Sequence, residues 1–413
     1  MYAKLKDFFL AKPITLLVVY TLVALIATLQ EYNGGGKRFP TQKNDHDYTY
    51  YNNYLIFKQS FFHLKDGADL YALHLDEHWD LYKYSPTFAF LFGVFVFLPD
   101  SIGLLLWNLA NALCLFFAIR MLPRLDVGKK NLILLLALVE LFTSLQNSQS
   151  NALIAGLIVF AFALMEKEKF FWACLCIALT VYIKLFGLFA FAICLLYPQR
   201  WKMIGYSIVA MVLLALLPLF VMSAPQLILT YESWWHLLQN DYMPNGLSLV
   251  GVAQALLGIS LDQSLVLLVG IILFLIPFSR IKFHGQYNFR LAVLSMILLW
   301  MIVFNHKAES PTFIIGITGI GIWYFSSGLT SRWRTALVLS ALVFTSLSTT
   351  DLFPDFIQDN FFVPWSVKAI PCIVIYFVVF YELAFKPEIF INPSPQPSPP
   401  GEGVRGTRTG EGK

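Results

Sequence analysis

The first thirty residues, MYAKLKDFFLAKPITLLVVYTLVALIATLQ (1–30), combine a basic end with a long apolar run. An apolar run of about 18 residues is long enough to cross a bilayer as an α-helix. A secretory signal peptide has a shorter apolar core and a small-residue cleavage site, and this stretch has neither. We therefore expect an uncleaved first transmembrane helix, and this sets the class of the whole fold.

The rest of the chain has the same character. Of its 413 residues, 58% are hydrophobic and only 13% are charged, whereas soluble domains average about 25% charged residues. Apolar runs separated by short charged loops predict an all-α, polytopic integral membrane helix bundle with about twelve transmembrane helices. After the first, these helices are expected near 101–121, 131–145, 152–166, 170–183, 187–199, 203–222, 263–282, 288–304, 311–326, 334–350 and 366–385. Segment 86–98 is too short to span and predicts a juxtamembrane or re-entrant helix.

Basic residues predict how the bundle is oriented. Lys4, Lys6 and Lys12 precede the first helix, so the positive-inside rule places the N-terminus in the cytoplasm. With this count, four further basic pairs also fall on the cytoplasmic side: Lys167 with Lys169, Arg200 with Lys202, Arg280 with Lys282, and Arg332 with Arg334. We expect a protein of the bacterial plasma (inner) membrane with both termini cytoplasmic. No basic block suggests nucleic-acid binding.

The domain organisation is simple. One membrane domain is expected over 1–385, and the Pro/Gly-rich tail, 386–413, lacks an apolar period and is expected to be disordered. The polar segments then gather on the exterior side, led by a long first exterior loop, 32–85. Because ionisable groups at membrane depth are costly and usually functional, this face is the expected place of a site.

The first exterior loop supplies candidate general bases. Asp47, Asp69 and Asp80 are among its seven carboxylates. A carboxylate placed beside a sugar hydroxyl can accept its proton. The alternative for each is a solvated loop charge.

A lysine and two amides follow on the same side. Lys184 stands at the tip between 170–183 and 187–199. There it can neutralise a lipid phosphate as a point charge, or simply extend to the headgroups. Gln149 and Asn151, in LQNSQSN, can hydrogen-bond hydroxyls, although capping the next helix is the commoner use of such an Asn.

The tip NHKAES (305–310) brings together His306, Lys307 and Glu309. Turn chemistry accounts for its Asn and Ser but not for three ionisable residues, which solvated loop charges would also explain. Glu140, inside an apolar run, is a candidate buried proton site or a structural hydrogen-bond partner. The sequence has no P-loop, dinucleotide fingerprint or Cys/His metal cluster, so we expect no cofactor and no metal.

The order of the motifs resembles glycosyltransferase family 87. The motifs are DLY (69–71), YSP (84–86), GLLLWNLANALCLF (103–116), SQSN (148–151), YIKLFGL (182–188), NGLSLVG (245–251) and SPTF (310–313). The resemblance covers roughly 10–385 and implies a GT-C-like fold. It also implies an inverting hexosyltransferase that moves a sugar from a polyprenyl-phosphate donor to a glycolipid or glycan acceptor. Mannose is the sugar that the family suggests.

The resemblance also suggests roles for residues. A first-loop carboxylate would be the base, and Lys184, helped by His306 or Lys307, would hold the donor phosphate. The substrate-binding candidates are Asn52, Asn53, Gln149, Asn151, Asn245 and Glu309.

One departure from the family pattern concerns the base. Where the family has an aspartate after the first span, this chain has Asn52 and Asn53, and an amide cannot accept a proton as a general base. Either a nearby acid, Asp47 first, takes over, or the activity is changed or lost. A non-catalytic relative, a glycan ligase and a secondary transporter remain alternatives, although transporters show paired halves that this sequence lacks.

Overall fold

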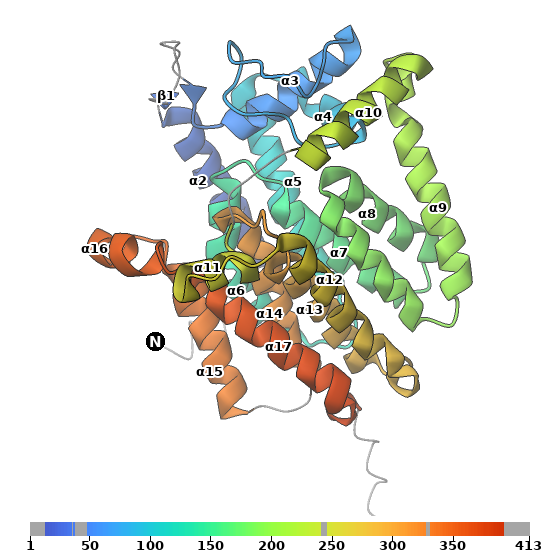
Figure 1. Ribbon diagram of the computed structural model, residues 1–413, viewed down its shortest axis with the longest axis vertical. Helices are drawn as coiled ribbons and strands as arrows, with labels where there is room; N and C mark the ends of the chain where they lie inside the picture. The colour runs from blue at the N-terminus through green and yellow to red at the C-terminus, as the bar shows by residue number, and fades with distance from the viewer. Residues whose placement is uncertain (1–12, 35, 38–47, 241–245, 328–330, 392–413) are drawn as a thin grey trace, which may run out of the picture.

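The computed structural model describes residues 13–34, 36–37, 48–240, 246–327 and 331–391, and it is almost entirely helical (Figure 1). Its strands in these ranges are the antiparallel pair β1 (Gly36–Lys37) and β2 (Tyr48–Thr49). The α-helices in chain order are α2 (Pro13–Asn33), α3 (Asn52–Asp66), α4 (Pro86–Val96), α5 (Asp100–Met121), α6 (Val127–Leu145), α7 (Asn151–Met165), α8 (Phe170–Ile183), α9 (Arg200–Leu216), α10 (Ala224–Asn240), α11 (Leu249–Leu257), α12 (Gln263–Leu275), α13 (Tyr287–Val303), α14 (Phe313–Ser326), α15 (Arg332–Ser340), α16 (Asp355–Ile357) and α17 (Ile370–Phe385).

Shorter 3-10 and π segments extend or join these helices. They are η1 (Leu185–Leu196), η2 (Leu217–Phe220), η3 (Ile276–Ser279), η4 (Ile281–Phe283), η5 (Ser310–Thr312), η6 (Ala341–Leu347), η7 (Gln358–Phe362), η8 (Val367–Ala369) and η9 (Pro387–Phe390). Every predicted membrane segment overlaps a helix, but the one near 187–199 is the 3-10 helix η1. The predicted short segment 86–98 is α4.

Four helices among the described residues are long and apolar enough to cross a membrane: Ile14–Asn33, Asp100–Met121, Arg200–Phe220 and Val367–Phe385. Six more apolar helices are shorter, with 10–17 residues each. The predicted all-α integral membrane protein is confirmed. The number of twelve spanning helices stays a prediction.

The helices α13 and α14 form the centre of the bundle. Because α13 is apolar on all sides, nearly all of it is buried. Small residues let α14 approach it closely: a Cβ added to Gly319 would lie 3.1 Å from Leu298 Cβ. At the same place the Ser295 hydroxyl donates to the Gly319 carbonyl over 2.7 Å. Such close approach at small residues is typical of helix packing in membranes.

Buried charges in the bundle are paired. Glu140 on α6 binds Lys368 on η8 at 2.7 Å, and both side chains are buried. Arg334 on α15 likewise binds Glu382 on α17 at 2.6 Å. An apolar interior tolerates charges when they are paired in this way. For Glu140 this favours the structural alternative over a free proton site.

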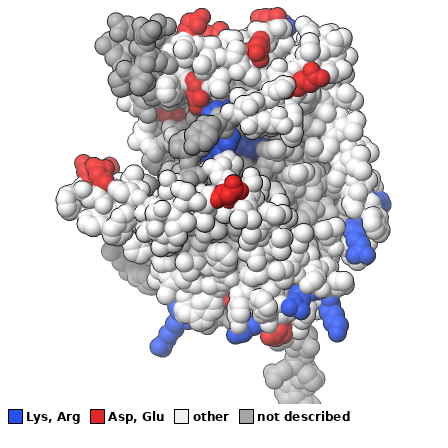
Figure 2. Space-filling model, in the orientation of Figure 1, with Lys and Arg blue, Asp and Glu red and all other residues white. Residues whose placement is uncertain are grey.

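The two ends of the bundle differ in charge. Helices α3 and α10 lie at one end and the C-terminal end of α17 at the other (Figure 1). Figure 2 shows Asp and Glu gathered at the α3–α10 end and Lys and Arg around the opposite end. Helix α3 lies within the predicted exterior loop 32–85, so that segment is not an open loop.

Candidate functional site

Lys184 is the centre of the polar group at the α3–α10 end. Helix α8 stops at Ile183, and Lys184 takes an extended conformation before η1 begins. Its Nζ donates to Gln149 Oε1 at 3.2 Å and to Asn151 Oδ1 at 2.9 Å. The ring of Tyr84 lies 5.8 Å from the same Nζ. Three of the predicted site residues thus meet, and Tyr84 of the YSP motif joins them.

The two amides are held by a turn between α6 and α7. Ser148 has a φ of 47°, the left-handed region, so the chain reverses sharply there. The Trp107 indole donates to the Ser148 carbonyl at 2.9 Å, and the Ser148 hydroxyl donates to Glu31 Oε1 at 2.7 Å. Trp107 and Glu31 are both buried. The turn therefore presents Gln149 from a rigid support.

Asn151 is the first residue of α7, but it does not act as a cap. The cap position belongs to Ser150, and no side-chain cap bond forms there. Instead, Asn151 Nδ2 donates to the Pro311 carbonyl at 3.0 Å. Because its nitrogen is used in this way, its oxygen faces Lys184. The capping alternative for Asn151 is wrong.

The charge of Lys184 is incompletely satisfied. Its two hydrogen bonds go to neutral amides, and among the described residues no carboxylate forms an ion pair with it. An ammonium group has three donors, so one remains for another acceptor. Burial lowers the pKa of Lys184 to about 8, and the nearby negative charge of Glu309 acts in the opposite direction. The arrangement is suited to an anion.

Two acidic residues act electrostatically on the neighbouring Tyr84. The Tyr84 hydroxyl donates to Gln149 Oε1 at 3.3 Å. Its pKa is raised, first by burial and then by the charges of Glu309 and Asp80. Figure 2 shows basic atoms recessed in a hollow of this face, with acidic residues above and below it.

Asp80 and Asp69 are both exposed but differ in their surroundings. Asp80 has a φ of 122°, its Oδ1 accepts from Leu81 N at 2.7 Å, and Lys83 Nζ lies 3.6 Å away. Asp69 Oδ1 accepts from Tyr71 N at 3.0 Å, an Asx turn. Asp69 therefore shapes its own turn, whereas the charge of Asp80 reaches Tyr84. Asp47 lies outside the described residues.

Asn52 and Asn53 hold the predicted exterior loop in place. Asn52 Oδ1 accepts from Trp79 N at 2.8 Å, and Asn53 Nδ2 donates to the Asn147 carbonyl at 2.8 Å. Asn52 thus fixes the segment that precedes Asp80, and Asn53 ties α3 to the turn carrying Gln149. Both side chains serve to position the loop.

The last two polar landmarks also meet here. Gly246 N donates to the His306 carbonyl at 2.7 Å, and Leu247 N donates to the Ala308 carbonyl at 2.7 Å. A Cβ on Gly246 would lie 2.4 Å from Ala308 O, so this contact requires glycine. The Glu309 side chain is exposed at the end of the same tip, where His306 and Lys307 are half-buried. Asn245 lies outside the described residues.

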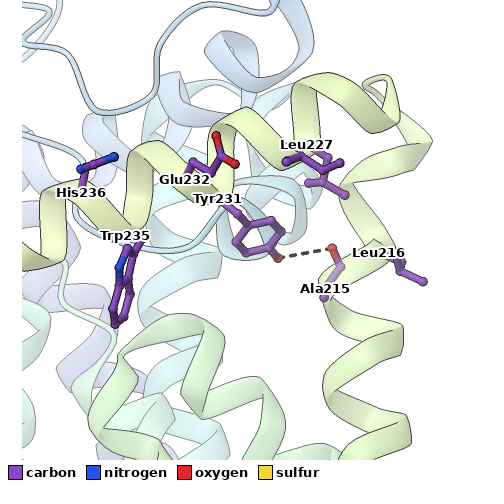
Figure 3. A pocket seen from close by; sticks show the side chains of 8 residues that line it. Ala215, Leu216, Leu227, Tyr231, Glu232, Trp235 and His236 are labelled. Atoms are coloured by element: carbon purple, nitrogen blue, oxygen red, sulfur yellow. Dashed lines mark hydrogen bonds between the residues drawn. The ribbon is translucent and has the colours of Figure 1, made fainter.

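An apolar cavity of about 450 Å³ lies between α9 and α10 (Figure 3). Tyr231 of α10 donates to the Ala215 carbonyl of α9 at 3.3 Å, and its hydroxyl lies 2.8 Å from Thr87 Oγ1 of α4. Since Ser85 caps α4 and Tyr84 precedes it, this contact connects the cavity to the Lys184 group. The cavity is lined by Ala215, Leu216, Leu227, Ile228, Tyr231, Glu232, Trp235 and His236.

A model of glycosyltransferase family 87 matches residues 82–305, more than half of the chain. The chain belongs to glycosyltransferase family 87. The matched range of this family 87 protein contains Tyr84, Gln149, Asn151 and Lys184, whereas Asp80 precedes it.

Solved structures and curated proteins add less. The crystal structure of ArnT from Cupriavidus metallidurans in the apo state is similar in shape, with a TM-score of 0.45 and 11% sequence identity. That alignment covers 90% of this family 87 chain and 77% of the ArnT chain. The search of curated proteins found no match.

Proposed function

We propose that this family 87 protein transfers a hexosyl unit, mannosyl as the first expectation, from a polyprenyl-phosphate donor to a glycolipid or glycan acceptor. The observation that carries the proposal is the ammonium of Lys184, held by two neutral amides with no carboxylate counter-ion among the residues that the structure describes. A phosphate diester monoanion supplies the missing charge and the missing acceptor.

The donor phosphate is assigned to Lys184, with His306 and Lys307 on the nearby tip as further candidates. As the bond between the anomeric carbon and the phosphate oxygen breaks, negative charge grows on the phosphate. A fixed ammonium group then stabilises the transition state more than the ground state. Gln149 and Asn151 orient this ammonium group, and the exposed Glu309 is a candidate contact for the acceptor sugar.

The general base is assigned first to Asp80, and Asp69 and Asp47 are the other candidates. Its carboxylate takes the proton of the acceptor hydroxyl, and the oxygen attacks the anomeric carbon. The polyprenyl phosphate leaves from the opposite side, so the configuration is inverted. The position of Asp80 supports this choice: it is exposed, Asn52 holds the preceding Trp79 N, and the His78 ring holds the Asp80 carbonyl.

The polyprenyl tail is assigned to the apolar cavity between α9 and α10. Its lining is mainly aliphatic and aromatic, and the Thr87–Tyr231 contact joins it to the segment that carries Tyr84. In this proposal the lipid tail lies next to α4, the helix that follows Tyr84.

We also propose that the α3–α10 end is exterior, that both termini are cytoplasmic, and that the protein lies in a bacterial inner membrane. Basic residues at the opposite end support this orientation (Figure 2). The domain is expected to be a GT-C-like unit over 1–385, with 386–413 as a tail.

The test uses the full chain in lipid nanodiscs with radiolabelled polyprenyl-phosphate mannose and glycolipids extracted from the host. Asp80→Asn is expected to lower turnover by about 10²–10⁴-fold, as expected for removal of a general base. Asp69→Asn and Asp47→Asn are run beside it, with the exposed Asp76→Asn as the matched control. If Asp47→Asn instead abolishes transfer, the base is reassigned. Folded protein that transfers no polyprenyl-phosphate sugar at all would contradict the proposal and favour a transporter or a non-catalytic relative.

A further inference from the structure

Three metal-ligating side chains meet in the first exterior loop, away from Lys184. His63 lies near the end of α3, and His74 and Glu77 lie in the segment that follows. Their potential ligand atoms all lie within 4.8 Å of one another. His63 Nε2 is 2.9 Å from Glu77 Oε2, and the centroids of the His63 and His74 rings are 3.8 Å apart. These residues lie outside the range 82–305 that the family model matches, and the proposed reaction does not involve them.

The backbone around the cluster fixes the protonation of one histidine. His74 Nε2 lies 2.9 Å from the Asp69 carbonyl oxygen. A carbonyl only accepts, so Nε2 carries the hydrogen and Nδ1 keeps its lone pair. Metal-ligating histidines are typically oriented in this way, through the second ring nitrogen bonding to a carbonyl or carboxylate. His74 therefore has the tautomer of a metal ligand.

A third histidine adjoins the cluster. His78 Nδ1 donates to the Asp80 carbonyl at 3.0 Å, which leaves Nε2 with a lone pair. Its ring centroid lies 6.1 Å from that of His74, and the residue is buried. An imidazole nitrogen that keeps its lone pair is the form that binds metals.

We propose that His63, His74 and Glu77 bind one divalent transition-metal ion of the zinc type. Two imidazoles and a carboxylate are a common zinc donor set, with water in the fourth position. The ligand atoms need only draw together to bonds of about 2.0–2.2 Å. The sequence gives no spacing signal for this site, because its ligands come from a helix end and an irregular loop.

The ion would fasten the loop that carries the proposed base. It joins α3 to the segment 74–78, and the ring of His78 in turn holds the carbonyl of Asp80. Asp80 has a φ of 122°, a conformation that persists only where the surroundings impose it. The metal is thus assigned a structural part, apart from the sugar-transfer chemistry.

The test measures metal binding by the full chain in nanodiscs, without sugar donor, so it is independent of the transferase proposal. Protein stripped with a chelator is titrated with Zn²⁺, and bound metal per chain is counted by mass spectrometry. We expect one equivalent and a higher unfolding temperature. His74→Gln and Glu77→Gln should each reduce affinity by at least about tenfold, since each removes a ligand. Asp76→Asn, the neighbouring exposed acid, should bind as the wild type does.

Co²⁺ provides the spectroscopic check. Tetrahedral visible bands without a sulfur charge-transfer band are expected, because all five cysteines are outside the cluster. If the stripped protein binds no metal, or if His74→Gln and Glu77→Gln both bind as tightly as the wild type, the cluster is only a hydrogen-bonded histidine stack and the proposal is wrong. Size-exclusion profiles confirm folding, and His74→Asn replaces any variant that fails it.

Discussion

Two lysines near the segment 310–313 have opposite surroundings. Lys368 binds the buried carboxylate of Glu140 at 2.7 Å, and its Nζ lies 5.5 Å from the Phe313 ring. Within the described part of the chain, Lys184 binds amide oxygens and no carboxylate; one of these oxygens is on Asn151, whose nitrogen donates to the Pro311 carbonyl. The first lysine belongs to a neutral pair that closes the bundle, and the second keeps a charge that a ligand can use. What a lysine does in a membrane protein therefore depends on the charge of its partner.

The largest expected effect comes from unpairing Lys368. Glu140→Gln leaves a buried ammonium without its counter-ion, which typically costs about 3–5 kcal/mol of unfolding free energy. Thermal unfolding in detergent measures this loss. The double variant Glu140→Leu with Lys368→Met should recover much of it, because no charge is then buried. A double variant as unstable as the single one would show that Lys368 is not a structural partner.

Removing Lys184 should lower catalysis strongly and stability only slightly, the reverse of the Glu140 variant. Lys184→Ala loses one charge-assisted hydrogen bond to the donor, about 1.5–3 kcal/mol, so kcat/KM for the donor falls about 10–100-fold. Its unfolding temperature should change less than that of Glu140→Gln, because no ion pair is broken. The exposed Lys65→Ala is the matched control. A large loss of stability with unchanged kcat/KM would make Lys184 a second structural lysine.

The pH dependence sharpens the same difference. Burial lowers the pKa of Lys184 to about 8. The ammonium form binds phosphate and is present below this pKa, so donor binding should weaken about tenfold between pH 7 and pH 9. Lys184→Arg should remove this dependence, since arginine stays charged. The profile of kcat/KM for the donor against pH is the measurement, and a flat wild-type profile would contradict the assignment.

The smallest effect is expected at the Gly246 contact. Gly246→Ala places a Cβ 2.4 Å from Ala308 O, so the 246–248 segment must move from the 305–308 tip. Loss of one or two backbone hydrogen bonds, about 0.5–1.5 kcal/mol each, should raise the donor KM several-fold. Gly205→Ala, with no atom within 4 Å of the added Cβ, should leave KM unchanged. If both variants behave alike, the tip does not contribute to the site.

Several features followed from the sequence because their cause is local. Apolar runs predicted the helices, and the short run at 86–98 predicted α4. Placing the polar loops at one end predicted that SQSN, Lys184 and SPTF would lie near one another. Asn151 connects all three, since it donates to the Pro311 carbonyl and accepts from Lys184 Nζ. The role of Asn151 was less predictable, because a helix-start asparagine is usually a cap.

Other features depended on partners far apart in the chain. Lys368 is 228 residues from Glu140, so neither residue alone indicates the pair. The same holds for Tyr84, because Gln149 and Lys184, which it contacts, lie on other segments far along the chain. The histidine cluster is close in sequence but gives no spacing signal, because its residues come from a helix end and an irregular loop.

By itself, the sequence determined that this is a helical membrane protein and which residue types its polar loops supply, because burial in lipid is read from hydrophobicity along the chain. Only the tertiary structure decided which charges are neutralised and which stay available. Glu140 forms an ion pair with Lys368, whereas Lys184 is hydrogen-bonded to neutral amides. These different partners are brought together by the fold. Electrostatic energy depends on distance and burial, and sequence separation specifies neither.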